Sequence, residues 1–225
     1  MKNKAFTLAE VLITIGIVGV VAALTIPTLI TNYRASVLSS QFHKAYSSLT
    51  QATSLISSKE YDSSADLGTV PVGELLEHYQ NHMIKAVKCD LHQSDCPLGI
   101  FPQKYNGSFL SFVESNYKTY NGKKVSGMCM SDSALVLQNG MFIIVDNCSP
   151  IVIAVDTNGW QKPPNRFGHD FFMFQMVDNQ LIPMGNAKTK EQFSQCSSSG
   201  SSGYNGLGCT DRAMKTKDYF KKLPK

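Results

Sequence analysis

The chain opens with MKNKAFTLAEVLITIGIVGVVAALTIPTLI (Met1–Ile30), a short basic head followed by a long apolar run. From Val11 to Tyr33 there are 23 residues without a charged side chain, and about 20 apolar residues are enough to span a bilayer as a helix. One carboxylate, Glu10, lies at the start of this run. A charged group inside such a segment costs roughly 2.5–3.5 kcal/mol on insertion scales, so we expect Glu10 to have a partner.

Residues 5–13 (AFTLAEVLI), with Pro27 further along, resemble the cleavage and methylation segment of type IV pilins and type II secretion pseudopilins. The resemblance implies that a prepilin peptidase cuts between Ala5 and Phe6 and that the new Phe6 amino group is methylated. Glu10 takes the place of the family's acidic residue, and Pro27 that of its helix-kinking proline. One position departs from the family, because the residue before the cut is usually glycine and here is Ala5, which is also small.

The resemblance also implies the organisation of the chain and its fold. We expect a leader at 1–5, a transmembrane and filament-core helix at 6–30, an amphipathic half of the same helix at 31–57, and a globular periplasmic or extracellular domain at 58–225. The fold class is α+β, with the long N-terminal helix packed on an antiparallel sheet.

The implied function is that of a structural subunit, which polymerises through its N-terminal helix into a type IV pilus or a type II secretion pseudopilus. Its partners would be other pilin or pseudopilin subunits, in a helical homo- or hetero-polymer, the prepilin peptidase and the inner membrane. The chain would be a single-pass inner-membrane protein before assembly. The alternative is a minor, tip-located pilin that acts as an adhesion or DNA-binding module. Two questions stay open: whether the filament is a pilus or part of a secretion system, and whether the chain is a major or a minor subunit.

Glu10 has a physical role that suits such an assembly. The methylated amino group of Phe6 is a cation that polymerisation would bury, and Glu10 of the adjoining subunit is the anion that neutralises it. Either charge alone is costly in an apolar core, whereas the pair specifies the register of the two subunits. The simpler alternative is a carboxylate at the membrane boundary that reaches water.

Two other interpretations of the N-terminus compete with this one. Lys2 and Lys4, an apolar core and Val21-Ala22-Ala23 also form an ordinary secretory signal with a small-residue cleavage site. A plain membrane anchor is the second. Both leave Glu10 unexplained.

Composition fits an exported, anchored protein of 225 residues. Loss of the leader would lower the formal net charge from +4 to +2, which is too small to make nucleic acid or an anionic membrane the main partner by overall charge. The cysteines are even in number and all lie beyond the apolar segment, as suits an oxidising compartment. They are Cys89, Cys96, Cys129, Cys148, Cys196 and Cys209.

Periodicity predicts the remaining elements. Apolar residues at three- and four-residue spacing continue the first helix to about Ser57, and a similar pattern predicts a second helix at 72–88. Residues 90–127 read as irregular. Asn139-Gly140 and Asp178-Asn179 are hairpin turns between apolar runs. The predicted strands are 134–138, 141–145, 151–155, 171–177 and 180–182.

The cysteines suggest three disulfides. Cys196 and Cys209 enclose a serine- and glycine-rich loop that needs a clamp, and this resembles the C-terminal disulfide loop of many pilins. Cys129 and Cys148 lie across the first hairpin, which leaves Cys89 with Cys96. The alternative is a zinc site built from Cys89, His92 and Cys96, with His78 and His82 one helical turn apart.

Other patterns give weaker hypotheses. Asp156, Asn158 and Asp170 suit calcium, although Asp-x-Asn-Gly is first of all turn chemistry. No cofactor is otherwise expected, and the familiar hydrolase, phosphate-loop and metalloprotease motifs are absent, so no enzyme is predicted. Aromatic residues alternate with lysines at Tyr117–Lys124 and Lys215–Lys225, and such a mixture can bind single-stranded nucleic acid. Solvated lysines on a surface loop explain the pattern more simply.

Overall fold

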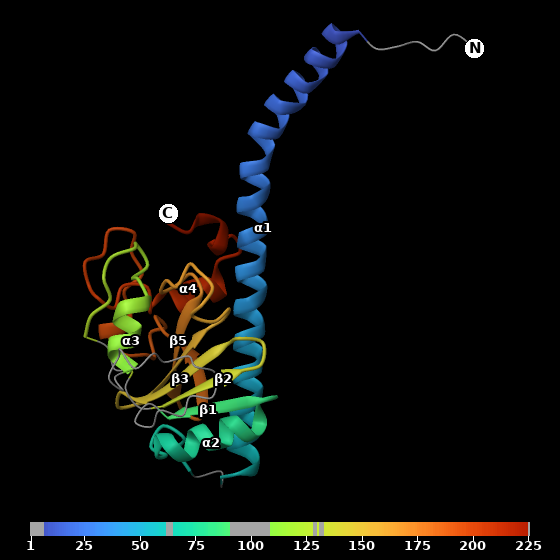
Figure 1. Cartoon of the computed structure of the whole chain (residues 1–225). Coiled ribbons are helices and arrows are strands. Elements are labelled where there is room, and N and C mark those ends of the chain that lie inside the picture. Colours follow the sequence, from blue (N-terminus) through green and yellow to red (C-terminus); the bar gives the residue numbers. More distant parts are fainter. Residues whose placement is uncertain (1–6, 62–64, 91–108, 128–129, 131–132, 225) are drawn as a thin grey trace. The chain divides into compact units, whose positions relative to one another are not determined.

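The computed structural model describes residues 7–61, 65–90, 109–127, 130 and 133–224. The chain forms two compact units, Met1–Val37 and Leu38–Lys225. Helix α1 (Leu8–Lys59) supplies the described part of the first unit and the opening of the second. All the other helices and strands belong to the second unit (Figure 1).

The 52-residue α1 confirms the predicted long helix and passes through Pro27 without ending. In its N-terminal part, threonine hydroxyls donate to carbonyl oxygens one turn back: Thr14 to Glu10, Thr25 to Val21 and Thr31 to Pro27, each at 2.9 Å. These polar groups are therefore satisfied inside the helix, as a lipid-facing segment requires.

The part of α1 in the second unit packs on the sheet. Phe42, Ala45, Leu49, Ala52 and Ile56 repeat at three- and four-residue spacing and are at most 2% exposed. This buried stripe is the apolar face that the periodicity predicts. The Phe42 ring lies 4.4 Å from that of Phe172, and Tyr46 stacks on Phe174.

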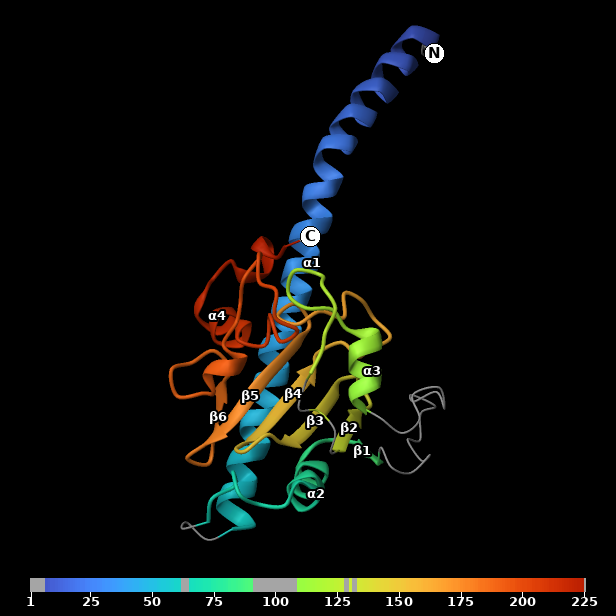
Figure 2. The same cartoon turned by 90° about the vertical axis from the view of Figure 1, so that its left-hand side faces the viewer.

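The sheet is a six-stranded antiparallel meander in the order β1 to β6 (Figure 2). The fold is therefore the predicted α+β, pilin-like architecture, a long N-terminal helix followed by an antiparallel sheet. The strands are β1 (Ala86–Asp90), β2 (Ser133–Leu137), β3 (Phe142–Asn147), β4 (Ile151–Asp156), β5 (Phe171–Val177) and β6 (Gln180–Pro183).

Both faces of the sheet are buried, which explains why its central strands are apolar throughout. In β5, Phe172 and Phe174 contact α1, whereas Phe171 and Met173 belong to a second core on the opposite face. Phe112 of α3 (Phe109–Asn116) lies in that second core. Successive residues of a strand point to opposite faces, so one strand serves both layers.

The two predicted hairpins form, and they use different turns. Between β2 and β3, Gly140 has φ 87° and Leu137 N–H donates to Met141 O, the pattern of a three-residue loop with a glycine bulge. Between β5 and β6, Asp178 and Asn179 both have positive φ, 50° and 58°, as a type I′ turn requires.

Two predictions of secondary structure were wrong. The helix predicted at 72–88 ends early, because α2 spans Val72–His82 and β1 follows. Lys85 turns the chain at φ 53°, and pairing of β1 with β2 then buries Cys89. Within the supposedly irregular 90–127, α3 forms. The C-terminal region also contains α4 (Cys209–Lys215) and short 3-10 helices at Glu191–Phe193 and Tyr219–Lys222.

Candidate functional site

Glu10 has a partner within its own chain. Its Oε2 accepts hydrogen bonds from the Thr7 backbone N–H (2.8 Å) and the Thr7 hydroxyl (2.7 Å). In return, the Glu10 N–H donates to Thr7 Oγ1 at 3.3 Å. Because α1 begins at Leu8, Thr7 is the N-cap and Glu10 the third helical residue, which is the capping-box arrangement.

The capping box satisfies N–H groups that the first helical turn leaves without partners, and this matters most where water is scarce. The sequence signal for this capping box is Thr-x-x-Glu at Thr7–Glu10, directly before the apolar run. The Glu10 carboxylate is therefore hydrogen-bonded within the single chain, at the beginning of the helix.

The first unit exposes an apolar surface. Large apolar side chains between Leu8 and Ile30 are 44–79% exposed. In the part of the chain that the structure describes, α1 is the one helix with the length and composition to cross a membrane. Such a surface needs either lipid or other helices around it. Ala5 and Phe6, which flank the predicted cut, lie outside the described residues.

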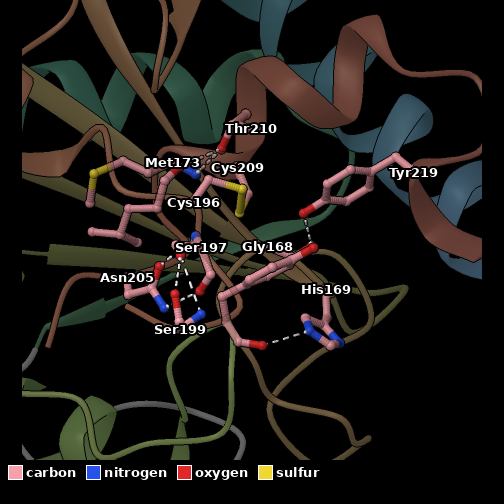
Figure 3. The surroundings of a disulfide bond; sticks show 12 residues. Gly168, His169, Met173, Cys196, Ser197, Ser199, Asn205, Cys209, Thr210 and Tyr219 are labelled. Carbon is pink, nitrogen blue, oxygen red and sulfur yellow. Dashed lines mark hydrogen bonds between the residues drawn. A yellow bond between two sulfur atoms is a disulfide. The ribbon is translucent and has the colours of Figure 1, made fainter. Parts of the chain in front are cut away.

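The C-terminal loop is closed by a disulfide between Cys196 and Cys209, with the two Cα atoms 4.8 Å apart (Figure 3). Inside the loop, Asn205 binds both backbone groups of Ser197: its Oδ1 accepts from the N–H at 2.9 Å, and its Nδ2 donates to the carbonyl at 2.8 Å. The other end of the loop passes into α4 at Cys209.

Gly168 is what allows the disulfide to lie so close to the 166–171 turn. A Cβ on Gly168 would meet Cys209 Cβ at 2.8 Å and the Tyr219 hydroxyl at 2.9 Å, and its φ is +74°. The Tyr219 hydroxyl instead donates to the Gly168 carbonyl at 2.6 Å, which ties the C-terminal segment to this turn (Figure 3).

The other cysteines are only partly described. Cys89 is disulfide-bonded, so it does not offer the thiolate that the zinc alternative requires. Cys96, Cys129 and His92 lie outside the described residues, and the pairings Cys89–Cys96 and Cys129–Cys148 stay predictions. Cys148 is buried, and its Sγ lies 3.4 Å from Asp146 Oδ1.

His78 and His82 instead lie beside carboxylates. His82 Nε2 is 3.0 Å from Glu60 Oε1, and His78 Nδ1 is 3.8 Å from Glu60 Oε2. Among the described residues, no three His, Cys, Asp or Glu side chains form a group suited to a metal ion. These contacts link the end of α1 to α2.

Asp156 and Asp170 form a buried acidic pair. Asp156 accepts from Tyr117 Oη (2.5 Å) through Oδ2 and from the Asn158 and Gly159 N–H groups through Oδ1. Burial raises the pKa of Asp156 to about 6, although these hydrogen bonds act in the opposite direction. Burial, and after it the charge of Asp156, raises the pKa of Asp170 to about 7.

This arrangement has the hydrogen bonds of a turn, at the place where the sequence suggested calcium as an alternative to turn chemistry. The two oxygens of Asp170 accept from the Asn165 and Arg166 N–H groups at 2.8 Å. Two nearby amide oxygens, those of Asn158 and Asn165, are buried without a hydrogen bond. Carboxylate and amide oxygens suit a hard cation, while the N–H donors already serve the carboxylates. Calcium at this place stays a hypothesis beside the simpler interpretation as a turn.

The sequence neighbours His169 and Asp170 play separate parts. The His169 Nε2 lies 3.1 Å from the Tyr120 carbonyl oxygen, and burial, followed by the positive charge of Arg166, lowers the pKa of His169 to about 4. The imidazole is therefore neutral and donates from Nε2. Asp170 serves the turn before β5 and is not bonded to His169.

The aromatic residues that alternate with lysines are buried. Tyr117, Tyr120 and Tyr219 are 0%, 6% and 3% exposed, whereas Lys118, Lys123 and Lys124 lie on the surface. Bases stack only on exposed aromatic faces, so these tyrosines do not provide the platform that single-strand binding requires.

The comparisons with known proteins bear on the N-terminal segment. Residues 1–26 match the family model of the prokaryotic N-terminal methylation motif, which is the signature of type IV pilins and pseudopilins. The curated proteins and the solved structures gave no match. The matched residues include Thr7 and Glu10, the capping box at the start of the exposed apolar helix. The chain therefore carries the N-terminal segment of a type IV pilin-like or pseudopilin precursor.

Proposed function

We propose that this chain is a structural subunit that polymerises through the N-terminal part of α1 into a type IV pilus or a type II secretion pseudopilus. The observation that carries the proposal is the methylation motif at residues 1–26, which directly precedes and overlaps the exposed apolar helix. Before assembly the subunit is a single-pass precursor in the inner membrane, and it then enters a periplasmic or extracellular filament.

The physical argument is that the apolar surface of the N-terminal part of α1 suits both the lipid bilayer and the core of a filament. Side chains of Leu8 to Ile30 are exposed in the single chain, and they can be covered by lipid before assembly or by neighbouring helices afterwards. The capping box leaves Glu10 with its charge. A methylated Phe6 amino group from the next subunit would neutralise this charge when both enter an apolar filament core.

Mass spectrometry of the chain from its native host tests the processing step. We expect a mature chain that begins with N-methylated Phe6, and its recovery in sheared filament fractions or in cross-linked ladders of several subunits. Ala5→Leu places a large side chain at the cut and should leave the precursor intact, whereas Ala9→Leu, beyond the cut, should be processed. A mature chain beginning at Leu24 would indicate an ordinary signal peptide and contradict the proposal.

The alternative of a DNA-binding tip subunit receives less support. Its main sequence argument was the alternation of tyrosines with lysines, and the tyrosines of that pattern are buried. A measurement of subunit stoichiometry separates a main structural subunit, which dominates the filament, from a rare tip subunit.

A further inference from the structure

Positive charge in this protein is concentrated at its C-terminal end. Residues 209–225 contain six Lys or Arg and two Asp, a formal net charge of +4 that equals the charge of the whole chain. Two of these cations have acidic partners, since Lys215 pairs with Asp211 at 2.7 Å and Lys221 with Asp218 at 3.0 Å. The excess is therefore a local surface feature even though the net charge is small.

A second basic segment adjoins this one. Lys118 is bridged on one side to Lys124 and on the other to Arg166, and residues directly opposite in such bridges point to the same face. Arg166 Nη1 donates to the Pro224 carbonyl at 3.2 Å, which joins the 118–124 turn to the C-terminal segment. We call the combined set the basic surface: Lys118, Lys123, Lys124, Arg166, Lys217, Lys221 and Lys222.

Within the described part of the chain, Lys118, Lys123 and Lys124 are exposed and have no carboxylate within 4.0 Å. Like charges placed directly opposite one another destabilise a bridge. An anionic partner outside the chain would offset this repulsion. The surface therefore has the charge of a binding site for a polyanion.

Chain connectivity limits the distance between the C-terminal part of this surface and the apolar run. Phe220, beside Lys221, packs on Phe42 with ring centroids 5.7 Å apart. Phe42 lies nine positions beyond Tyr33, where the uncharged run ends. This stretch spans about 14 Å as a helix and about 30 Å fully extended, which limits how far Phe220 and the adjacent Lys221 can lie from the end of the apolar run.

We propose that the basic surface docks on the anionic phospholipid headgroups of the membrane that anchors the precursor, and so holds the second unit at the membrane before assembly. The inference rests on the anchored precursor of the proposed function. Tethering gives the surface a high effective concentration of lipid, which a nucleic acid would lack. Each Lys near an anionic membrane contributes about fivefold in binding, and the effect decays within about 8 Å at physiological salt.

Lysine footprinting of the full-length chain in lipid nanodiscs tests the proposal. The chain is placed in nanodiscs of neutral phosphatidylcholine or of phosphatidylcholine with phosphatidylglycerol, and mass spectrometry follows the acetylation rate of each lysine. We expect Lys217, Lys222 and Lys124 to react at least about fivefold more slowly in the anionic nanodiscs at low salt, and high salt to remove the difference. Lys59 and Lys88, which are exposed outside the basic surface, serve as internal controls.

A pair of matched variants makes the test specific. Lys217→Gln with Lys222→Gln should reduce the protection of Lys124, whereas Lys59→Gln with Lys88→Gln removes the same charge and should leave it unchanged. Equal rates in the two nanodiscs, or equal protection of every lysine, would overturn the inference and leave the proposed function intact. Protection by added duplex DNA but not by anionic lipid would assign the surface to nucleic acid instead. A chain that enters neither nanodisc would contradict the proposed function as well.

Discussion

At the scale of single residues, different substitutions can separate the observed capping role of Glu10 from its proposed pairing with the Phe6 amino group of a neighbouring subunit. Glu10→Gln keeps the capping box, because glutamine also serves at this helical position, but it removes the charge. Thr7→Ala removes the cap and keeps the charge. The cap is worth about 1 kcal/mol, whereas breaking a buried ion pair by deleting one partner costs about 3–5 kcal/mol.

We therefore expect Glu10→Gln to insert and be processed normally but to enter filaments poorly, and Thr7→Ala to assemble close to the wild-type level. Immunoblots of sheared filament fractions and of membranes measure both steps. The reverse order, with Thr7→Ala failing and Glu10→Gln assembling, would show that Glu10 acts through the helix cap alone.

Asp156 and Asp170 predict an unusual dependence of stability on pH. Their pKa values in the fold, about 6 and about 7, lie above the ordinary value of 3.8, so the folded state binds protons more tightly than the unfolded state. Their contribution to stability is therefore complete below about pH 4 and is lost as the pH rises through the folded pKa values.

Asp156→Asn should weaken this dependence. An Asn side chain keeps the acceptor for the Asn158 and Gly159 N–H groups, and the Tyr117 hydroxyl can turn to accept a hydrogen bond. Relative to the wild type, the variant should gain about 1–3 kcal/mol in free energy of unfolding between about pH 5 and pH 8, measured with urea. The exposed Asp66→Asn is the control, and identical pH profiles for Asp156→Asn and wild type would contradict the prediction.

At the scale of elements, we expect the loop at 196–209 to depend on the disulfide that closes it. The two cysteines are 13 positions apart, and in the chain-entropy model closure of such a loop contributes about 3 kcal/mol. Because Cys209 also begins α4, loss of the bond should loosen both the loop and the helix.

Replacement of both cysteines by Ala should lower the free energy of unfolding by about 2–4 kcal/mol and increase amide hydrogen exchange across 197–215. Ser201→Ala, in the same loop, should change neither quantity. Unaltered exchange in the double variant would mean that the hydrogen bonds of Asn205 suffice to hold the loop.

At the scale of the whole molecule, the division at Val37 and Leu38 predicts that the second unit folds without the first. A chain of residues 38–225, made in an oxidising compartment, should unfold cooperatively in urea, as followed by Trp160 fluorescence. Phe42→Ala in this chain should cost about 3–5 kcal/mol, because Phe42 is fully buried against Phe172. A non-cooperative transition of the parent chain would show that the second unit needs the first.

Those parts of the structure whose signals are local could be predicted from the sequence. Four features depend only on residues that are close in the sequence: the apolar run, the methylation motif, the buried stripe of α1 and the two hairpin turns. Each is found where it was predicted. The prediction of a helix at 72–88 was wrong for its last residues, because residues 86–90 form β1 instead. Their backbone pairs with β2, which lies more than forty residues away in the sequence.

Which polar and aromatic residues face solvent depends instead on how distant segments pack. The sequence grouped Tyr117 and Tyr120 with the surface lysines, yet the core encloses both rings. It also did not show that Asp156 and Asp170 share one buried environment, or that the C-terminal lysines adjoin the 118–124 turn through Arg166. These relations join residues far apart in the chain, and burial and long-range electrostatics depend on the packed fold rather than on local pattern.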